Sequence, residues 1–106
     1  MRITTTIARR GRALLRAELE TIAVAAGAAV TLSPGRSTGT VTHPVTGRRL
    51  TIAYDAESDR YNLTLSAPGR SISSNTHVPP ALLRDRVADF ARSWADDPRT
   101  WTVQPR

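Results

Sequence analysis

The sequence contains no cysteine and no lysine, and aromatic residues make up only 5% of its 106 residues. Without cysteine there can be no disulfide framework, no thiolate nucleophile and no cysteine-based metal site. The lack of cysteine fits a reducing cytosol, although many exported proteins contain none either. With so few aromatic rings, the hydrophobic core has to be built mainly from Leu, Ile, Val and Ala.

Long hydrophobic runs are absent as well. No apolar run reaches the roughly 18 residues of a membrane-spanning helix. The uncharged stretch 21–32 follows a basic segment and imitates the hydrophobic region of a signal peptide. Glu18 and Glu20 stand at its entrance, however, where a signal peptide carries only positive charge. We therefore expect a cytoplasmic protein with no membrane partner, and secretion is the less favoured alternative.

All fifteen basic residues are arginine, and with nine acidic residues they give a formal net charge of +6. Arginine can bind a phosphate through two parallel hydrogen bonds, so this charge favours polyanionic partners. Arginine without lysine is also typical of a GC-rich coding genome. On that alternative the charge is compositional and carries no function.

The first quarter of the chain has the hydrophobic periodicity of a helix. The threonines at 4–6 are expected to cap its start, and Gly27 is expected to end it. Gly11 costs about 1 kcal/mol relative to alanine inside a helix, so it either starts the regular helix or permits close packing. The apolar stripe comprises Ala8, Gly11, Leu15, Leu19, Ile22 and Ala26, widened by Leu14.

Between residues 30 and 67 the period changes to two, which is typical of strands. A first hairpin is predicted around the turn at 33–39, and a second joins 50–56 to 61–67. The alternation of apolar and polar residues predicts a sheet with one buried and one wet face. In the second hairpin the expected buried residues are Leu50, Ile52, Tyr54, Tyr61, Leu63 and Leu65.

The segment 67–80 is polar, and Ile72 marks either a short fifth strand or part of a loop. Pro79 and Pro80 suit the first turn of a second helix. Residues 98–106 are expected to form a short tail. The apolar stripe of the second helix comprises Leu83, Val87, Phe90, Ala91 and Trp94.

Together these elements predict one α+β domain over residues 1–106. We expect a two-layer sandwich, with an N-terminal helix, a four- to five-stranded antiparallel meander and a C-terminal helix. Both helices are expected to cover the apolar face of the sheet. The opposite face, rich in Thr, Ser and Asn, is left for solvent or a partner.

Arginines on the first helix are candidates for binding nucleic acid. Arg9, Arg12 and Arg16 share one helical face with Arg10 beside it, an arrangement that can neutralise several phosphates with little sequence preference. The alternative is a solvated helix face. It would be partly neutralised by an i,i+4 pair between Arg16 and Glu20, which contributes only a few tenths of a kcal/mol.

Further candidates lie in predicted turns, where long side chains can reach outward. In the second helix, by contrast, three arginines are offset by four aspartates. The excess positive charge therefore lies on the first helix and the loops, which is the electrostatic footprint of a nucleic-acid-binding protein. The candidates in turns are Arg36, Arg48, Arg49 and Arg70.

No catalytic signature is present, and we expect neither a cofactor nor a metal. His43 and His77, with Arg48 and Arg49, are a candidate metal-independent ribonuclease site, with one histidine as general base and an arginine stabilising the phosphorane. Both histidines are expected in exposed loops, and nothing in the sequence fixes the distance between them. The acidic residues at 55–59 lack the glycine and the closing glutamate of a calcium loop.

The sequence favours a small, non-enzymatic binding module that contacts nucleic acid or another polyanion through the first helix and the hairpin loops. The main alternative is a protein-interaction or assembly module, such as an accessory, immunity or phage-type protein, with compositional charge. A small ribonuclease comes third. Nucleic acid and an acidic protein are the candidate partners. A homodimer is a further candidate, because a meander leaves edges and an open face.

Overall fold

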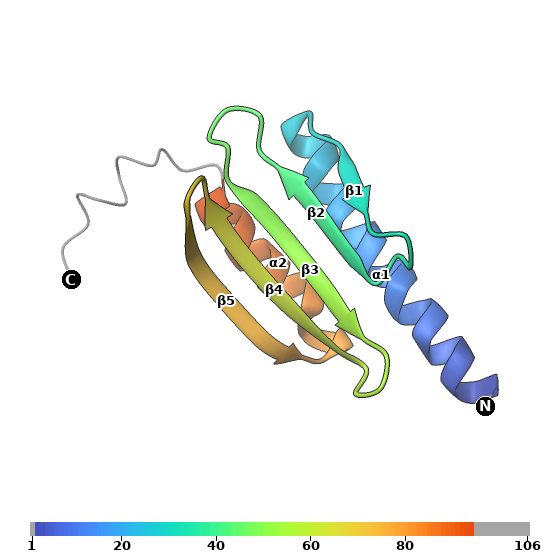
Figure 1. Cartoon of the computed structure of the whole chain (residues 1–106). Helices are drawn as coiled ribbons and strands as arrows, with labels where there is room; N and C mark the ends of the chain where they lie inside the picture. The colour runs from blue at the N-terminus through green and yellow to red at the C-terminus, as the bar shows by residue number, and fades with distance from the viewer. Residues whose placement is uncertain (1, 95–106) are drawn as a thin grey trace.

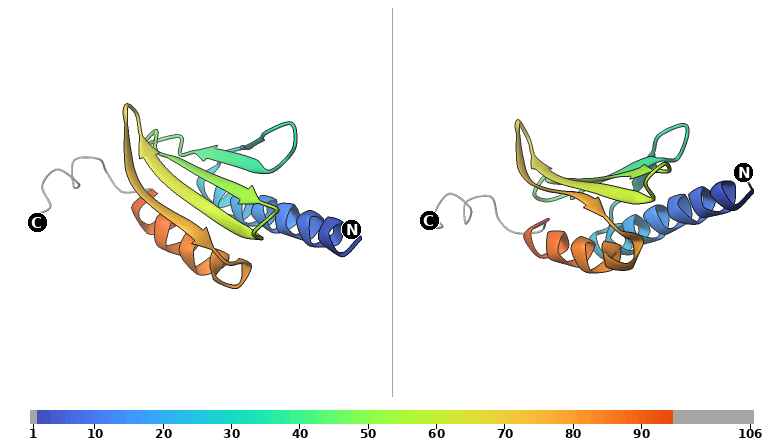
Figure 2. Two further views of the ribbon diagram at one scale, coloured as in Figure 1. Left: turned by 60° about the horizontal axis from the view of Figure 1, so that its bottom comes forward. Right: turned by 90° about the horizontal axis from the view of Figure 1, so that it is seen from below.

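A computed structural model describes residues 2–94 of the chain, and the side chains of residues 6–92. The side chain of Trp94 and the predicted tail at 98–106 lie outside them. The five strands form one antiparallel sheet in sequence order, and both helices cover the same face of it (Figure 1, Figure 2). The predicted α+β two-layer architecture is confirmed. The elements are α1 (Arg2–Ala26), β1 (Val30–Leu32), β2 (Thr38–Thr42), β3 (Arg49–Asp55), β4 (Arg60–Ala67), β5 (Arg70–Val78) and α2 (Pro80–Trp94).

Helix α1 begins earlier than the sequence indicates, because it already includes the threonines at 4–6. The prediction that these threonines cap the helix is wrong, since threonine carries only a modest penalty inside a helix. The predicted C-terminal end is confirmed. Gly27 has a φ of 71°, its amide donates to the carbonyl of Val24, and the amide of Ala28 donates to that of Ala23. This pair of bonds is a Schellman motif.

Replacing Gly27 by alanine should destabilise the protein by about 1 kcal/mol, because an L-residue is strained at positive φ. A Cβ at Gly27 would touch nothing within 4 Å, so the cost is conformational rather than steric. Gly35→Ala is the matched control, since its Cβ also meets open space and its φ is not in the left-handed region. Urea unfolding of the two variants measures the difference, and equal stabilities would contradict the assignment.

The register of β3 against β4 places apolar residues opposite one another on the side that faces the helices. Ile52 pairs with Leu63 and Tyr54 with Tyr61, and the two tyrosine ring centroids lie 4.9 Å apart. All six residues that the sequence predicts to be buried in this hairpin are at most 6% exposed. The predicted alternation is therefore confirmed.

The two edge strands are poor templates for pairing with another chain. Strand β5, which the sequence left open as a strand or a loop, spans nine residues but shifts its register against β4 twice. Strand β1, at the other edge, has only three residues. Bulged and short edges both disfavour the addition of a further strand.

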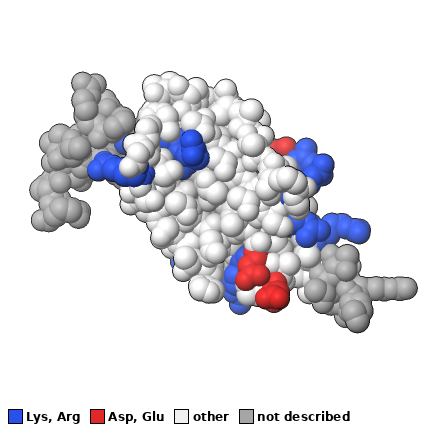
Figure 3. Space-filling view, viewed as in Figure 1, with Lys and Arg blue, Asp and Glu red and all other residues white. Residues whose placement is uncertain are grey.

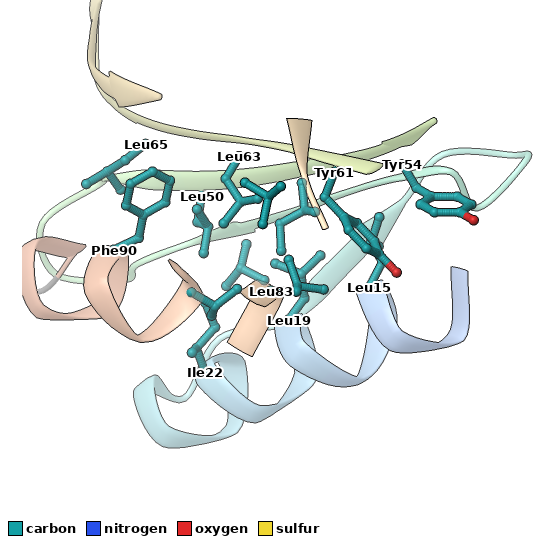
Figure 4. Close-up of a cluster of buried hydrophobic side chains, with 14 of the residues drawn as sticks. Leu15, Leu19, Ile22, Leu50, Tyr54, Tyr61, Leu63, Leu65, Leu83 and Phe90 are labelled. Atoms are coloured by element: carbon teal, nitrogen blue, oxygen red, sulfur yellow. The ribbon is translucent and has the colours of Figure 1, made fainter. Parts of the chain in front are cut away.

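The core lies between the sheet and the two helices (Figure 4). Leu15 and Leu19 of α1 are fully buried, as expected from the apolar stripe. In α2 the predicted stripe is confirmed at Leu83, Val87 and Phe90, all at most 5% exposed. Each such side chain contributes about 2 kcal/mol through burial.

Two glycines bring α1 close to the sheet. A Cβ at Gly39 on β2 would lie 2.5 Å from Cδ1 of Leu19. A Cβ at Gly11 would lie 2.2 Å from Cζ of Tyr54. Gly11 also lies well inside a helix that begins at Arg2. Of the two roles proposed for Gly11 from the sequence, the structure therefore favours close packing.

Candidate functional site

A groove of about 370 Å³ is lined by α1 and by the start of the β1–β2 hairpin. Three of the candidates, Arg9, Arg12 and Arg16, reach it from one face of α1. A fourth, Arg36, reaches it from the loop between β1 and β2, although it is distant in sequence. We call this site the arginine groove. Its remaining lining residues are Ala13, Ala17, Glu20 and Leu32.

The arginine groove carries an excess of positive charge. Nε of Arg16 donates to Oε2 of Glu20 over 2.9 Å, and both side chains are about half exposed. Among the residues with described side chains, Arg9, Arg12 and Arg36 form no ion pair. Four guanidinium groups therefore face a single carboxylate, and the resulting positive potential attracts anionic groups.

The floor of the groove is apolar. Ala13 and Ala17 lie one helical turn apart on α1, so their small side chains leave room between the arginines. Leu32 of β1 is partly buried at the core and adds an aliphatic surface. The periodicity of the sequence predicts the shared face of the arginines but not this floor. The only sequence signal for it is alanine placed directly after Arg12 and Arg16.

The loop holds Arg36 in a left-handed backbone conformation, with a φ of 61°. The amide of Arg36 donates to the carbonyl of Ser33 over 2.8 Å, and the amide of Ser33 donates to the carbonyl of Thr38. The amide of Thr38 in turn donates to Oγ of Ser33 over 3.2 Å. Positive φ is uncommon outside glycine and is frequent at functional sites. The Pro-Gly turn signal predicts the loop but not this conformation.

Arg10 does not share the groove with its neighbours in sequence. It lines a second hollow of about 320 Å³ with Gly11, Asp59, Tyr61 and Pro80, together with two apolar residues. Arg10 therefore faces a different hollow from Arg9, Arg12 and Arg16.

Arg49 and Arg70 lie at the far end of the sheet from the arginine groove. Both are exposed, as the sequence predicts. The β1–β2 loop lies beside Tyr54, whose amide donates to the carbonyl of Ser37. The five residue steps from Arg49 to Tyr54 along β3 correspond to about 17 Å. One short phosphate segment therefore cannot contact both places.

Arg48 does not reach solvent, and the expectation that it points outward from a turn is wrong. Its side chain is only 1% exposed. It directly precedes β3 and lies two and four residues before Leu50 and Ile52. Because side chains alternate between the two faces of a strand, Arg48 points to the helix-facing side of the sheet, as these two residues do. Burying a guanidinium is costly unless its donors are satisfied, which makes Arg48 a structural residue rather than a contact for phosphate.

The two histidines lie at opposite ends of the sheet. His43 follows β2 at the end where Thr42 pairs with Arg49, and its Nδ1 accepts from the amides of Val45 and Thr46. His77 lies beside Asn62, whose Oδ1 accepts from its amide. The strands between these ends span about 17 Å or more. The two imidazoles therefore cannot act on the same phosphate.

Tyr61 joins α1 to the β3–β4 hairpin, and Tyr54 beside it bonds within the hairpin (Figure 4). The hydroxyl of Tyr61 donates to the carbonyl of Gly11 over 2.7 Å, and that of Tyr54 donates to Oδ1 of Asp59 over 2.6 Å. Burial, followed by the bond to Asp59, raises the pKa of Tyr54 to about 12. Burial raises the pKa of Tyr61 still further. Arg12 partly opposes the increase at Tyr54.

The described residues offer no alternative site of a common type. Among residues 2–94, no group of three His, Asp or Glu side chains could hold a metal ion. Neither of the two described helices is long and apolar enough to cross a membrane. No protein-family model, curated protein or solved structure matches the chain.

Proposed function

We propose that the protein binds the phosphate backbone of nucleic acid in the arginine groove. One observation carries the proposal: Arg9, Arg12 and Arg16 of α1 converge with Arg36 of the β1–β2 loop on one groove. Convergence of arginines from two separate elements is not expected from a basic composition alone. Guanidinium groups recognise phosphate oxygens through paired, charge-assisted hydrogen bonds.

The groove suits contacts to the backbone rather than readout of sequence. Its rim is cationic and its floor of Ala13, Ala17 and Leu32 is apolar, so phosphates meet the rim while sugars or bases contact the floor. Backbone contacts position a nucleic acid without distinguishing bases. The two tyrosines are buried and unavailable for base stacking. A cytoplasmic location, which remains a prediction, would give the protein access to DNA and RNA.

The geometry of the groove is compatible with one of the two alternative functions and disfavours the other. A protein-interaction or assembly module remains the main alternative, and an acidic protein segment would use the same arginines. A ribonuclease built on paired histidines is disfavoured, because His43 and His77 lie at opposite ends of the sheet. We therefore keep a non-enzymatic binding role.

Binding of a fluorescent oligonucleotide should weaken steeply with salt. If four arginines each displace a counterion, raising the salt from about 50 to about 200 mM should reduce the affinity by about 50- to 150-fold. Fluorescence anisotropy over a salt series measures the slope, with single-stranded and duplex probes compared. No binding of either probe at about 50 mM salt would overturn the proposal.

Charge-reversal variants distinguish binding in the arginine groove from a general effect of the net positive charge. Arg12→Glu with Arg36→Glu, one residue from each wall, should weaken binding by at least about tenfold and reduce the salt slope by about 2. The matched control, Arg70→Glu with Arg92→Glu, changes the net charge equally but lies outside the groove. If both pairs weaken binding to the same extent, the charge is compositional and the groove is not the site.

A further inference from the structure

The face of the sheet that the helices leave open is covered with hydroxyl groups. The register aligns one hydroxyl residue from each of the five strands in a single row across the sheet. Within this row, the Oγ1 atoms of Thr40 and Thr51 lie 3.2 Å apart. The row comprises Thr31, Thr40, Thr51, Thr64 and Ser74.

The charged side chains lie around the rim of this face, at its two ends and along the side of β1 and α1, and not at its centre (Figure 3). Arg49, which shares its register position with Ser66 and Ser71, makes one end basic. Asp55 and Glu57 make the other end acidic, at the β3–β4 hairpin. Nη1 of Arg60, which is also at this end, donates to the carbonyls of Ser58 and Asp59 and is thus turned towards the hairpin backbone.

We infer that this open sheet face binds a second copy of the chain. A hydroxyl both donates and accepts hydrogen bonds, so a hydroxyl-rich face can bond to the polar groups of an identical face. The arrangement of charge is also self-complementary. A two-fold axis in the plane of the interface and perpendicular to the strands brings Arg49 of each copy against Asp55 of the other. An axis along the strands would instead oppose Arg49 to itself.

The shape of the sheet limits how two copies can meet. The sheet is twisted, and its β4–β5 turn and its β1–β2 loop both rise on the side away from the helices (Figure 2). All sheets twist with the same hand, so two copies turned face to face pack with their strands about 30° apart. The edges, with β1 short and β5 bulged, do not offer a comparable contact.

The area available indicates a weak dimer. The five strands have 3, 5, 7, 8 and 9 residues, and at about 3.3 Å per residue and about 4.8 Å between strands they present about 500 Å² per copy. Two such faces bury at most about 1,000 Å², which is the lower limit for a specific interface. The face is polar, so we expect a dissociation constant of about 10–100 µM at low salt.

Sedimentation equilibrium of the full chain over a range of concentrations tests the dimer. Arg49→Glu should weaken dimerisation by about tenfold, because two-fold symmetry makes each substitution act twice. Asp55→Arg should weaken it similarly. An equimolar mixture of these two variants should dimerise again, since each then supplies the charge that the other needs.

Further variants distinguish a loss of dimerisation from a folding defect caused by the substitution itself. Asp55 also accepts bonds from the amide of Glu57 and from Oγ of Ser58, so Glu57→Arg provides a reversal at the acidic end that keeps those acceptors. Thr64→Arg places two like charges at the centre and should abolish the dimer. Arg10→Glu, on the helix side, is the charge control and should change nothing.

Two results would overturn the inference. One is a chain that stays monomeric up to about 1 mM at low salt. The other is a dimer that tolerates Arg49→Glu and Thr64→Arg unchanged, which would place the contact elsewhere. Neither result bears on the arginine groove, whose binding is measured separately with the oligonucleotide probes.

Discussion

Raising the pH above about 10 should destabilise this protein strongly, with its only two tyrosines as the cause. Tyr54 and Tyr61 are at most 6% exposed and both have raised pKa values in the folded state. In the unfolded chain they ionise near pH 10. Stability is therefore complete below pH 10 and is lost as the pH rises towards the folded pKa, which is about 12 for Tyr54.

The expected slope follows from proton linkage. Between about pH 10.5 and 12, a tyrosine that is protonated in the folded state but ionised in the unfolded state lowers the free energy of unfolding by about 1.4 kcal/mol per pH unit. Two of them give a loss on the order of 4 kcal/mol by pH 12, a large part of the stability of a domain of this size. The chain has no lysine or cysteine to obscure the effect, and arginine stays charged in this range.

Urea unfolding between pH 8 and pH 12 measures the slope, and tyrosinate absorption follows the ionisation directly. Tyr54→Phe should remove about half of the slope, and the double replacement with Tyr61→Phe should leave stability nearly flat. If the folded protein shows tyrosinate absorption with a midpoint near 10, the two rings are accessible and the expectation fails.

Gly11→Ala should destabilise the protein by about 2 kcal/mol, although alanine is the better helix former by about 1 kcal/mol. The new Cβ would lie 2.2 Å from Cζ and 2.5 Å from the hydroxyl oxygen of Tyr54, so the ring has to move. Moving it breaks the 2.6 Å bond to Asp59 and disturbs the ring contact with Tyr61. Loss of those contacts outweighs the gain in helix propensity.

The effect of Gly11→Ala on stability should change sign when the ring of Tyr54 is removed, which makes this prediction specific. In a Tyr54→Ala background the ring is gone, and Gly11→Ala should then stabilise the protein by about 1 kcal/mol. The coupling between the two positions is thus expected to be about 3 kcal/mol, far above that of independent sites. Chemical denaturation of the four proteins in the cycle provides the measurement. A destabilisation by Gly11→Ala that persists without the ring would rule out the steric explanation.

The local and periodic features of the fold could be predicted from the sequence. Alternation fixed which side of the β3–β4 hairpin is buried, and the helical stripes of α1 and α2 identified the core positions. The start of α1 was misjudged, because caps depend on competition between weak local preferences. The polar strand β5 was ambiguous because neither of its faces is strongly apolar.

The candidate site was predictable only in part. Spacing grouped Arg9, Arg12 and Arg16, since helical geometry is regular. That Arg36 joins them depends on how the β1–β2 loop folds back beside α1, and on a positive φ that no residue type signals there. Arg48 was assigned to solvent because it lies in a turn, whereas its burial depends on contacts between elements distant in sequence.

The order of the strands has a consequence for how the chain folds. Every strand pairs only with its neighbour in sequence, so each hairpin closes a short loop at little entropic cost. The contact between Gly11 and Tyr61, by contrast, bridges most of the sheet sequence. The meander can thus form before α1 docks, and a substitution at Gly11 would mainly accelerate unfolding rather than slow folding.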